Sequence, residues 1–148
     1  MNMKKRYLLC AFMACLLTFT FVGCQSGEDE VVLKKQCVIG NYSLRTELEE
    51  MKLEDTDRLF VRIKSVDGQE VTFDPFPKVE RYTRGRWKAL YFSEDSSVMT
   101  SGIPTVLENE EGGMHIPMRD LIGGFKKGIY RITMKLEDTD CAIIVKFV

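Results

Sequence analysis

The stretch of sequence that decides the fold is residues 130–136, Tyr-Arg-Ile-Thr-Met-Lys-Leu. Its apolar residues alternate one by one with polar residues, and residues 59–64, Leu-Phe-Val-Arg-Ile-Lys, show a similar pattern. Successive side chains of a β-strand point to opposite faces of the sheet, so this period of two predicts strands with one buried face. Both segments are therefore predicted to be half-buried strands.

Six further segments have the composition of short strands. These segments are residues 70–73, 78–82, 87–92, 98–103, 113–116 and 142–148. Asp-Gly, Arg-Gly and Gly-Gly pairs, which favour tight turns, separate several of them. These pairs lie at residues 67–68, 84–85, 112–113 and 123–124. The spacing predicts an all-β antiparallel sandwich of about seven to nine strands.

Two short segments depart from the strand pattern. The apolar residues of the segment 44–51 lie at helical spacing, and Thr46 with Glu49 has the spacing of a capping box. A short helix is therefore an alternative there. Residues 117–122 begin with proline and precede two glycines, which indicates a single helical turn. Neither segment changes the predicted fold class.

The beginning of the chain has the pattern of a secretion leader. A cationic start at residues 4–6 is followed by an uncharged apolar run and then by Gly23-Cys24. A helix needs about 20 apolar residues to cross a bilayer, and this run is shorter, which disfavours a retained membrane-spanning anchor. The order of these parts predicts a cleaved signal peptide over residues 1–23.

The end of the leader resembles the signals of bacterial lipoproteins, although Phe21 stands where leucine is commonest. The resemblance implies that Cys24 is acylated with palmitate-type chains and becomes the new N-terminus. Each buried CH₂ group of such chains adds about 0.8 kcal/mol of membrane affinity. We therefore expect a lipid-anchored protein of the bacterial cell envelope, at the outer membrane. A plain secretion signal with a chance cysteine is the alternative.

Residues 24–36 are predicted to be a flexible linker between the lipid anchor and a folded domain at residues 37–148. The segment 25–30 is polar and acidic and cannot bury enough apolar surface to fold. An acidic cluster directly behind a lipidated cysteine also resembles the surface-export signal of some Gram-negative lipoproteins. Display on the cell surface and an ordinary solvated linker both stay open.

The mature chain is acidic overall. Removing the three cations of the leader leaves 18 Lys and Arg residues against 22 Asp and Glu residues, a net charge of −4. A negative charge of this size gives no general attraction to nucleic acid or to anionic lipid. Nucleic acid is therefore excluded as an expected partner, and the membrane is reached through the lipid.

Only two of the five cysteines remain for the folded domain. Cys10 and Cys15 leave with the leader, and Cys24 is taken by the lipid. Cys37 and Cys141 then form an even pair in an oxidising compartment, which makes them candidates for a disulfide bond. Two buried free thiols are the alternative.

A seven-residue string, Met-Lys-Leu-Glu-Asp-Thr-Asp, occurs twice, at residues 51–57 and 134–140. Asp and Thr side chains form hydrogen bonds with nearby backbone groups and so favour turns before the next strand. Acidic loops could instead bind a hard cation such as Ca²⁺, but neither copy has the glycine and the oxygen ligands of a calcium loop. Turn formation is the preferred interpretation, and no metal or other cofactor is predicted.

Two longer patches carry a family resemblance. Residues 79–88 combine a strand, a glycine turn and a tryptophan, and residues 125–132 contain a Gly-x-Tyr-Arg strand entry. They resemble a bacterial immunoglobulin-like domain family of envelope lipoproteins and secreted proteins, over roughly residues 44–136. The resemblance implies an immunoglobulin-like sandwich in which Gly128 and Tyr130 define the fold. A tyrosine at this position can bond back to the preceding corner through its hydroxyl.

The sequence departs from this family pattern in its cysteines. The antibody-type disulfide would need cysteines in the strands around Val61 and Ile132, and neither strand has one. Apolar packing must replace that bond. If a first strand near Cys37 pairs with a last strand near Cys141, a disulfide would join the two terminal strands instead.

Catalytic signatures are weak. His115 is the only histidine of the chain, and no serine is visibly paired with it as a nucleophile. Zinc would need two or more His or Cys ligands, and no glycine-rich phosphate loop occurs. We therefore predict that the protein is not an enzyme. An unrecognised hydrolase is a remote alternative.

Aromatic and cationic residues gather around one of the predicted glycine turns. Tyr82, Trp87 and Tyr91 lie on either side of this turn, and Arg84 with Arg86 adds positive charge. Exposed rings could stack on a sugar or a peptide, which makes these five residues the candidate binding surface. The preferred interpretation nevertheless assigns Trp87 to the core, where large rings contribute most to burial.

The sequence thus predicts a lipid-anchored binding or assembly module of the cell envelope, with an unidentified envelope protein or a glycan as its partner. Three structural features distinguish the alternatives. An exposed row of aromatic residues favours glycan, a bare edge strand favours a protein that adds a strand, and a deep cleft around His115 favours an enzyme.

Overall fold

The structure of the protein is a computed structural model that describes residues 30–65, 67–97, 105–107 and 111–148. Val31–Val148 forms one compact unit. The predicted leader, Cys24 and the predicted strand at residues 98–103 lie outside the described residues.

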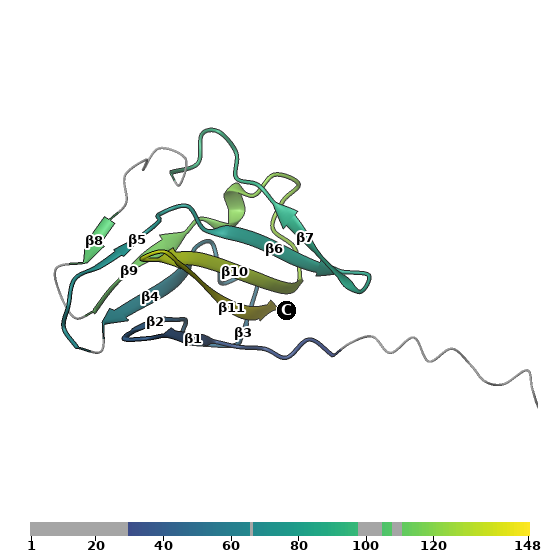
Figure 1. Ribbon diagram of the computed structural model, residues 1–148. Coiled ribbons are helices and arrows are strands. Elements are labelled where there is room, and N and C mark those ends of the chain that lie inside the picture. The colour runs from purple at the N-terminus through teal and green to yellow at the C-terminus, as the bar shows by residue number, and fades with distance from the viewer. Residues whose placement is uncertain (1–29, 66, 98–104, 108–110) are drawn as a thin grey trace, which may run out of the picture. The chain divides into compact units, whose positions relative to one another are not determined.

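Almost all regular structure in the described residues is β-structure (Figure 1). In chain order the strands are β1 (Gln36–Ile39), β2 (Tyr42–Arg45), β3 (Glu50–Met51), β4 (Leu59–Ser65), β5 (Val71–Phe73), β6 (Lys78–Thr83), β7 (Arg86–Leu90), β8 (Thr105–Leu107), β9 (Glu111–Ile116), β10 (Gly128–Leu136) and β11 (Thr139–Phe147). A short 3₁₀ helix, η2 (Met118–Asp120), follows β9. The all-β prediction is confirmed. The described strands outnumber the predicted seven to nine because pieces of two or three residues, such as β3 and β8, are too short to show an alternation.

The strands form two sheets. The smaller sheet has the order β1-β2-β4-β9, and the larger has the order β3-β11-β10-β5-β8. β6 also pairs with β10, and β7 pairs with β6. Among the strand pairs of the described residues, only the short pair of β11 with β3 is parallel. Buried residues from both sheets make up one core, so the sheets pack as the predicted sandwich.

The core is built from the alternation seen in the sequence. On β4 the residues Leu59, Val61 and Ile63 are at most 2% exposed, and on β10 the apolar residues from Tyr130 to Leu136 are at most 1% exposed. Each fully buried aliphatic side chain contributes about 1.5–3 kcal/mol. The two stretches that predicted the fold therefore lie in different sheets and bury their apolar faces in the same core.

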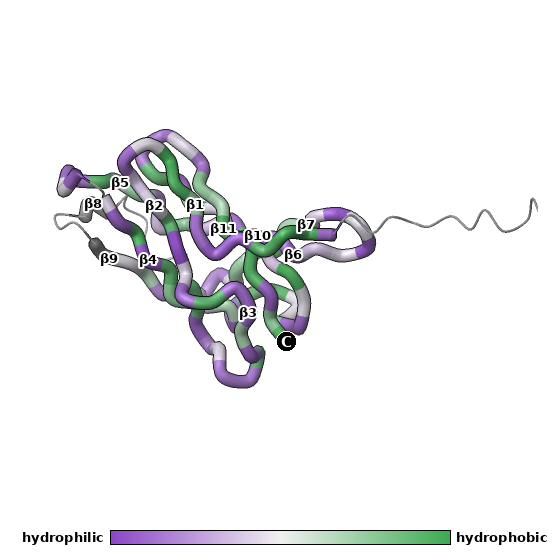
Figure 2. Tube along the Cα trace, turned by 90° about the horizontal axis from the view of Figure 1, so that it is seen from below, coloured by the Kyte–Doolittle hydropathy of each residue, from purple (hydrophilic) through white to green (hydrophobic). Residues whose placement is uncertain are grey.

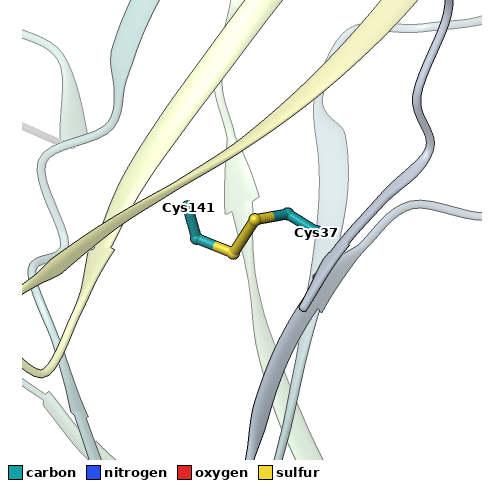
Figure 3. The surroundings of a disulfide bond; sticks show 2 residues. All are labelled: Cys37 and Cys141. Carbon is teal, nitrogen blue, oxygen red and sulfur yellow. A yellow bond between two sulfur atoms is a disulfide. The ribbon is translucent and has the colours of Figure 1, made fainter. Parts of the chain in front are cut away.

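A disulfide bond connects the two sheets, which confirms the predicted pairing of Cys37 with Cys141 (Figure 3). Their Cα atoms lie 5.8 Å apart. Cys37 belongs to β1 of the smaller sheet and Cys141 to β11 of the larger one. The condition considered for this bond, direct pairing of the first and last strands, is not met by β1, which pairs with β2. The chain touches β11 just before β1, through an isolated bridge between Lys34 and Ile144.

The short helix that was an alternative for residues 44–51 does not form, because β2 continues to Arg45, β3 occupies Glu50–Met51, and residues 46–49 between them are irregular. Leu44 lies in β2 and is fully buried, whereas Leu48 is 58% exposed. Pairing of β2 with both β1 and β4 satisfies the backbone in a way that an isolated helical turn does not. The expected helical turn after Pro117 is present as η2.

One of the four predicted turns is wrong. Gly112 and Gly113 lie inside β9, opposite Ile63 and Arg62 of β4. A Cβ atom at Gly113 would meet the backbone oxygen of the adjacent strand and the ring of Phe60. The glycine is therefore needed because an aromatic ring crosses β9 at this position, and not because the chain reverses.

The two copies of the repeated string adopt different structures that both contain a turn. In the first copy, the Thr56 hydroxyl donates a hydrogen bond to the Lys52 carbonyl at 2.8 Å. The second copy forms the β10–β11 hairpin, with Glu137 at a φ of 50°. The Glu137 carboxylate accepts a hydrogen bond from the Thr72 backbone N–H at 2.7 Å, which ties the hairpin to β5. Neighbouring strands therefore decide the structure of each copy.

Tyr130 and Gly128 shape the entry into β10. The Tyr130 hydroxyl donates a hydrogen bond to the Lys126 carbonyl at 2.6 Å and accepts one from the Lys126 N–H at 3.1 Å. Gly128 has a φ of 147°, which side-chain-bearing residues rarely adopt. The Tyr130 ring also packs edge-on against Phe125 and Phe147. The hydrogen bond from the Tyr130 hydroxyl to Lys126 is the predicted bond to the corner that precedes β10.

Candidate functional site

The β6–β7 hairpin forms an edge of the larger sheet and extends away from the rest of the sheet (Figure 1). Its two-residue turn consists of Arg84 and Gly85, with φ angles of 52° and 77°. Positive φ at both positions is the geometry of a type I′ turn, which matches the twist of the two strands. The tip of the hairpin is hydrophilic (Figure 2).

β7 presents an open backbone edge. Among the described strands it pairs only with β6. Thr83 and Arg86 flank the turn and are paired. In such a hairpin this pair is hydrogen-bonded, so the N–H and C=O groups of Trp87 and Ala89 point away from β6. Beyond β7, Phe92 is bridged to Leu121, so the open stretch is limited to the strand itself.

Two rings lie next to each other on the outer face of this hairpin. Tyr82 and Trp87 are cross-strand neighbours, and their ring centroids are 5.2 Å apart at an interplanar angle of 60°. Both are half-buried. Tyr91 lies just beyond β7 and is 70% exposed. The structure therefore brings two of the three predicted aromatic residues together and places the third at the far end of the strand.

Trp87 does not belong to the core, so that interpretation of the sequence is wrong. Inward-facing Val79 of β6 is fully buried, whereas Trp87 pairs with the outward-facing Tyr82. The Arg131 guanidinium lies over the indole, 4.5 Å from the ring centroid. Such a cation–π contact contributes about 0.5–2 kcal/mol and fixes the orientation of the ring.

Glu80 is a buried carboxylate beneath this outer surface, with 7% of its surface exposed. The Arg131 Nε donates a hydrogen bond to the Glu80 Oε2 at 2.7 Å, and the Lys78 Nζ lies 3.4 Å from the Oε1. The hydrogen bond from Arg131 is the largest cause that lowers the pKa of Glu80, and burial opposes it. The ion pair thereby holds the arginine that covers Trp87.

Replacing Glu80 with glutamine is expected to destabilise the protein at pH 7 by about 1–3 kcal/mol, because a buried, charge-assisted hydrogen bond is weakened. The pKa of Glu80 is lower in the folded state than its unfolded value of about 4.3. Its contribution is therefore complete above that pH and declines as the pH falls through the folded-state pKa. Urea unfolding of both proteins at pH 7 and pH 3 measures this, and the difference between them should shrink in acid.

The matched control for this substitution is Glu70→Gln, which neutralises an exposed carboxylate. We expect it to change the unfolding free energy by less than about 0.5 kcal/mol. A destabilisation by Glu80→Gln that stays equal at both pH values would contradict the role given to the Glu80 charge.

A groove of about 380 Å³ runs beside β7. It is lined by Phe76, Pro77, Lys78, Ala89, Leu90, Tyr91 and Phe92. Phe76 is 39% exposed, which is unusual for so large an apolar side chain. Phe76 was not among the residues predicted from the sequence, although its position between two prolines indicated a residue that is held outside a regular strand.

Cations surround the same edge. Arg84 and Arg86 are exposed at the tip of the hairpin, and Lys88 is exposed on β7. They lie on a chain whose predicted mature net charge is −4. The five residues of the predicted binding surface therefore belong to one hairpin and its continuation, with the rings on the outer face and the charges at the tip.

Within the described residues, the structure shows no contact between His115, the only histidine of the chain, and a nucleophilic side chain. His115 is exposed on β9 and contacts the ring of Phe60, with the ring centroids 4.9 Å apart. Ser96 instead donates its hydroxyl hydrogen bond to the Asp120 carboxylate at 2.8 Å. Within the described residues, no three His, Cys, Asp or Glu side chains are grouped so as to hold a metal ion.

No protein-family model matches the chain, and no curated protein sequence matches it significantly. No helix in the described part of the chain is long and apolar enough to cross a membrane.

Proposed function

We propose that the protein is a lipid-anchored binding module of the bacterial cell envelope that takes an extended segment of a partner protein along β7. The observation that carries this proposal is the open edge of β7 beside the Tyr82–Trp87 pair. An edge strand binds an extended peptide by adding it to the sheet, so that backbone hydrogen bonds give affinity and neighbouring side chains give specificity.

The surroundings of β7 indicate the chemistry of the partner segment. Arg84, Arg86 and Lys88 favour a segment with acidic residues, because complementary charges steer association and set register. The groove next to Phe76 and Tyr91 offers apolar contact for a large side chain. The expected ligand is thus an extended, acidic segment with an apolar anchor residue.

We infer that the sandwich is immunoglobulin-like and that a lipid on Cys24 holds it at the outer membrane. We further propose that the protein is displayed on the cell surface. The Tyr130 hydroxyl bond to the preceding corner supports the first part. The leader pattern supports the second. The compact unit begins at Val31, so about six residues separate it from Cys24, and as a flexible chain they would span roughly 13 Å, which keeps the domain within reach of neighbouring envelope proteins.

A glycan is the second candidate partner because Tyr91 is 70% exposed and can stack on a sugar. Trp87 favours it less, since Arg131 already lies over the indole. The two candidates differ in what they require from β7, because only a peptide needs the backbone groups of the open edge.

Membrane attachment is tested by replacing Cys24 with alanine in the producing cells. The wild-type protein should incorporate labelled palmitate and stay with the membrane fraction, whereas Cys24→Ala should lose the label and the attachment. Cys15→Ala, within the leader, is the matched control and should behave like the wild type. Wild-type protein without label would overturn the lipid anchor.

Partner binding is tested by photo-crosslinking in intact cells from a reactive amino acid at Tyr91. The control position is Val38 on β1, which is 58% exposed and lies on an edge of the other sheet. A protein adduct from Tyr91 but not from Val38 supports the proposal. Ala89→Pro should abolish the adduct, because it removes an outward N–H without breaking the pairing with β6. No adduct, a polysaccharide adduct, or an adduct unaffected by proline would each overturn strand addition.

A further inference from the structure

The side chains of β7 alternate between two faces of the strand. Arg86, Lys88 and Leu90 share one face, because every second side chain of a strand points the same way. Trp87 and Ala89 lie on the other face. Leu90 packs against the core, whereas the two cations before it are exposed. A strand added beside β7 therefore meets a cation, a second cation and an apolar residue, in that order, along one face.

The chain itself contains a segment with the complementary order. Residues 28–32 are Glu-Asp-Glu-Val-Val. With a period of two, Glu28, Glu30 and Val32 would share one face of an added strand. The first two residues of the segment lie outside the described residues, and the described part, residues 30–32, belongs to no strand. Val32 is 78% exposed, the largest exposure among the large apolar side chains of the described residues.

Parallel pairing brings the two orders into register. The pairs that it forms are Glu28 with Arg86, Glu30 with Lys88, and Val32 with Leu90. Opposite charges that lie directly across from each other stabilise a sheet, and so do packed apolar pairs. The antiparallel direction would keep only the middle pair and would set a glutamate against Leu90 and a valine against Arg86. The order of the residues therefore favours the parallel direction.

The segment cannot reach β7 of its own molecule. Lys34 is bridged to Ile144 of β11, and β11, β10, β6 and β7 follow one another as paired neighbours. Neighbouring strands lie about 4.8 Å apart, so a strand beyond β7 would lie roughly 24 Å from Lys34. The two residues of chain from Val32 to Lys34 span at most about 7 Å. A segment 28–32 that adds to β7 must therefore come from a second molecule.

We propose that residues 28–32 of one copy add to β7 of a second copy as a parallel strand. This inference rests on the proposed addition of a strand to β7 and identifies the partner as the same chain. The outward N–H and C=O groups of Trp87 and Ala89 would bond to the backbone of Glu28, Glu30 and Val32, the residues that flank those directly opposite. The contact joins two different surfaces, so it can repeat from copy to copy.

The test is photo-crosslinking between two differently tagged copies of the full chain, made together in the producing cells. The first copy carries a photoreactive amino acid in place of Tyr91, which follows Leu90. In the parallel register, this position lies opposite Leu33 of the second copy. The expected product carries both tags, and mass spectrometry should place the crosslink within residues 28–33 of the second copy.

Charge reversal tests the register. Glu28→Lys with Glu30→Lys in the second copy should lower the yield of the two-tag product by at least about tenfold, because two attractive pairs become repulsive. Arg86→Glu with Lys88→Glu in the first copy should restore the yield, which also shows that these variants fold. The matched control in the second copy is Asp55→Lys with Glu70→Lys, which makes the same change of charge at two exposed positions outside the segment. The control should leave the yield unchanged.

The possible results separate this inference from the proposed function. A crosslink to a different protein would overturn the second copy as the partner and leave strand addition to β7 standing. Absence of any protein adduct would overturn both. A crosslink within one copy, or a two-tag product that the lysine substitutions leave unchanged, would overturn the assignment of the segment. A loss that the glutamate substitutions do not restore would overturn the register.

Discussion

Replacing both Cys37 and Cys141 with alanine is expected to lower the free energy of unfolding by about 4–5 kcal/mol. The bond joins residues 104 positions apart, and it links the two sheets. Closing a loop of about 100 residues restricts the unfolded chain by about 4.7 kcal/mol in the chain-entropy model. Urea unfolding of the oxidised wild type and of the double variant measures the difference.

Reducing agent provides the control for this prediction. It should lower the unfolding midpoint of the wild type to about that of the double variant, and it should leave the variant unchanged, because alanine cannot be reduced. Alkylation of the denatured, unreduced wild type should label neither of the two cysteines. A double variant within about 1 kcal/mol of the oxidised wild type would contradict the role of the bond.

Replacing Phe147 with alanine is expected to cost about 3–5 kcal/mol of stability, the usual range for removing a buried ring. Phe147 is 1% exposed near the end of β11. Its ring packs edge-on against Phe125 at 4.6 Å and against Tyr130 at 5.4 Å between centroids. The substitution therefore opens a cavity next to the ring that forms the bond to the preceding corner.

Phe147→Leu is the matched control for this cavity, because it keeps an apolar side chain of similar volume. Its cost should be less than half that of the alanine variant. Urea unfolding gives both free energies, and near-ultraviolet circular dichroism reports the packing of the aromatic rings. Equal losses from both substitutions would show that edge-on ring contact, and not volume, dominates at this position.

The sandwich could be predicted because two stretches of sequence alternate without interruption. β4 and β10 are interior strands of their sheets, and every second residue of each is buried in the core. These buried positions are apolar, so the alternation can be seen in the order of the residues. Edge and linking strands carry no such pattern. β3 has two residues and forms because β11 is beside it, which no local property of the sequence indicates.

The candidate site could be predicted only in part. The period of two places Trp87 and Ala89 on one face of β7 and Leu90 on the other, but it does not state which face is inside. The large indole ring favoured burial of Trp87. In the structure Leu90 packs against the core instead, and Trp87 lies on the outer face beneath the Arg131 guanidinium. That arginine is 44 positions away in the chain, a contact that depends on the pairing of β6 with β10.

The structure of the repeated seven-residue string also depends on tertiary context. One sequence ends β3 and forms a loop in its first copy, and it forms a hairpin between the two longest strands in its second. Asp and Thr favour a turn in both, so local chemistry decides that the chain reverses. The neighbouring strands decide how far each strand continues, and in the same way the two ends of the segment 44–51, for which a short helix was an alternative, are paired in β2 and β3.

The open edge of β7 also bears on self-association and solubility. An unpaired strand is a template for a second copy of the same chain, and charged residues on such edges protect against aggregation. Two copies meeting through β7 would bring Arg86 and Lys88 of one molecule against the same residues of the other, so repulsion keeps the edges apart. At high ionic strength the range of that repulsion falls to a few ångströms. High salt concentration is therefore the condition that most favours dimers or fibres formed through β7.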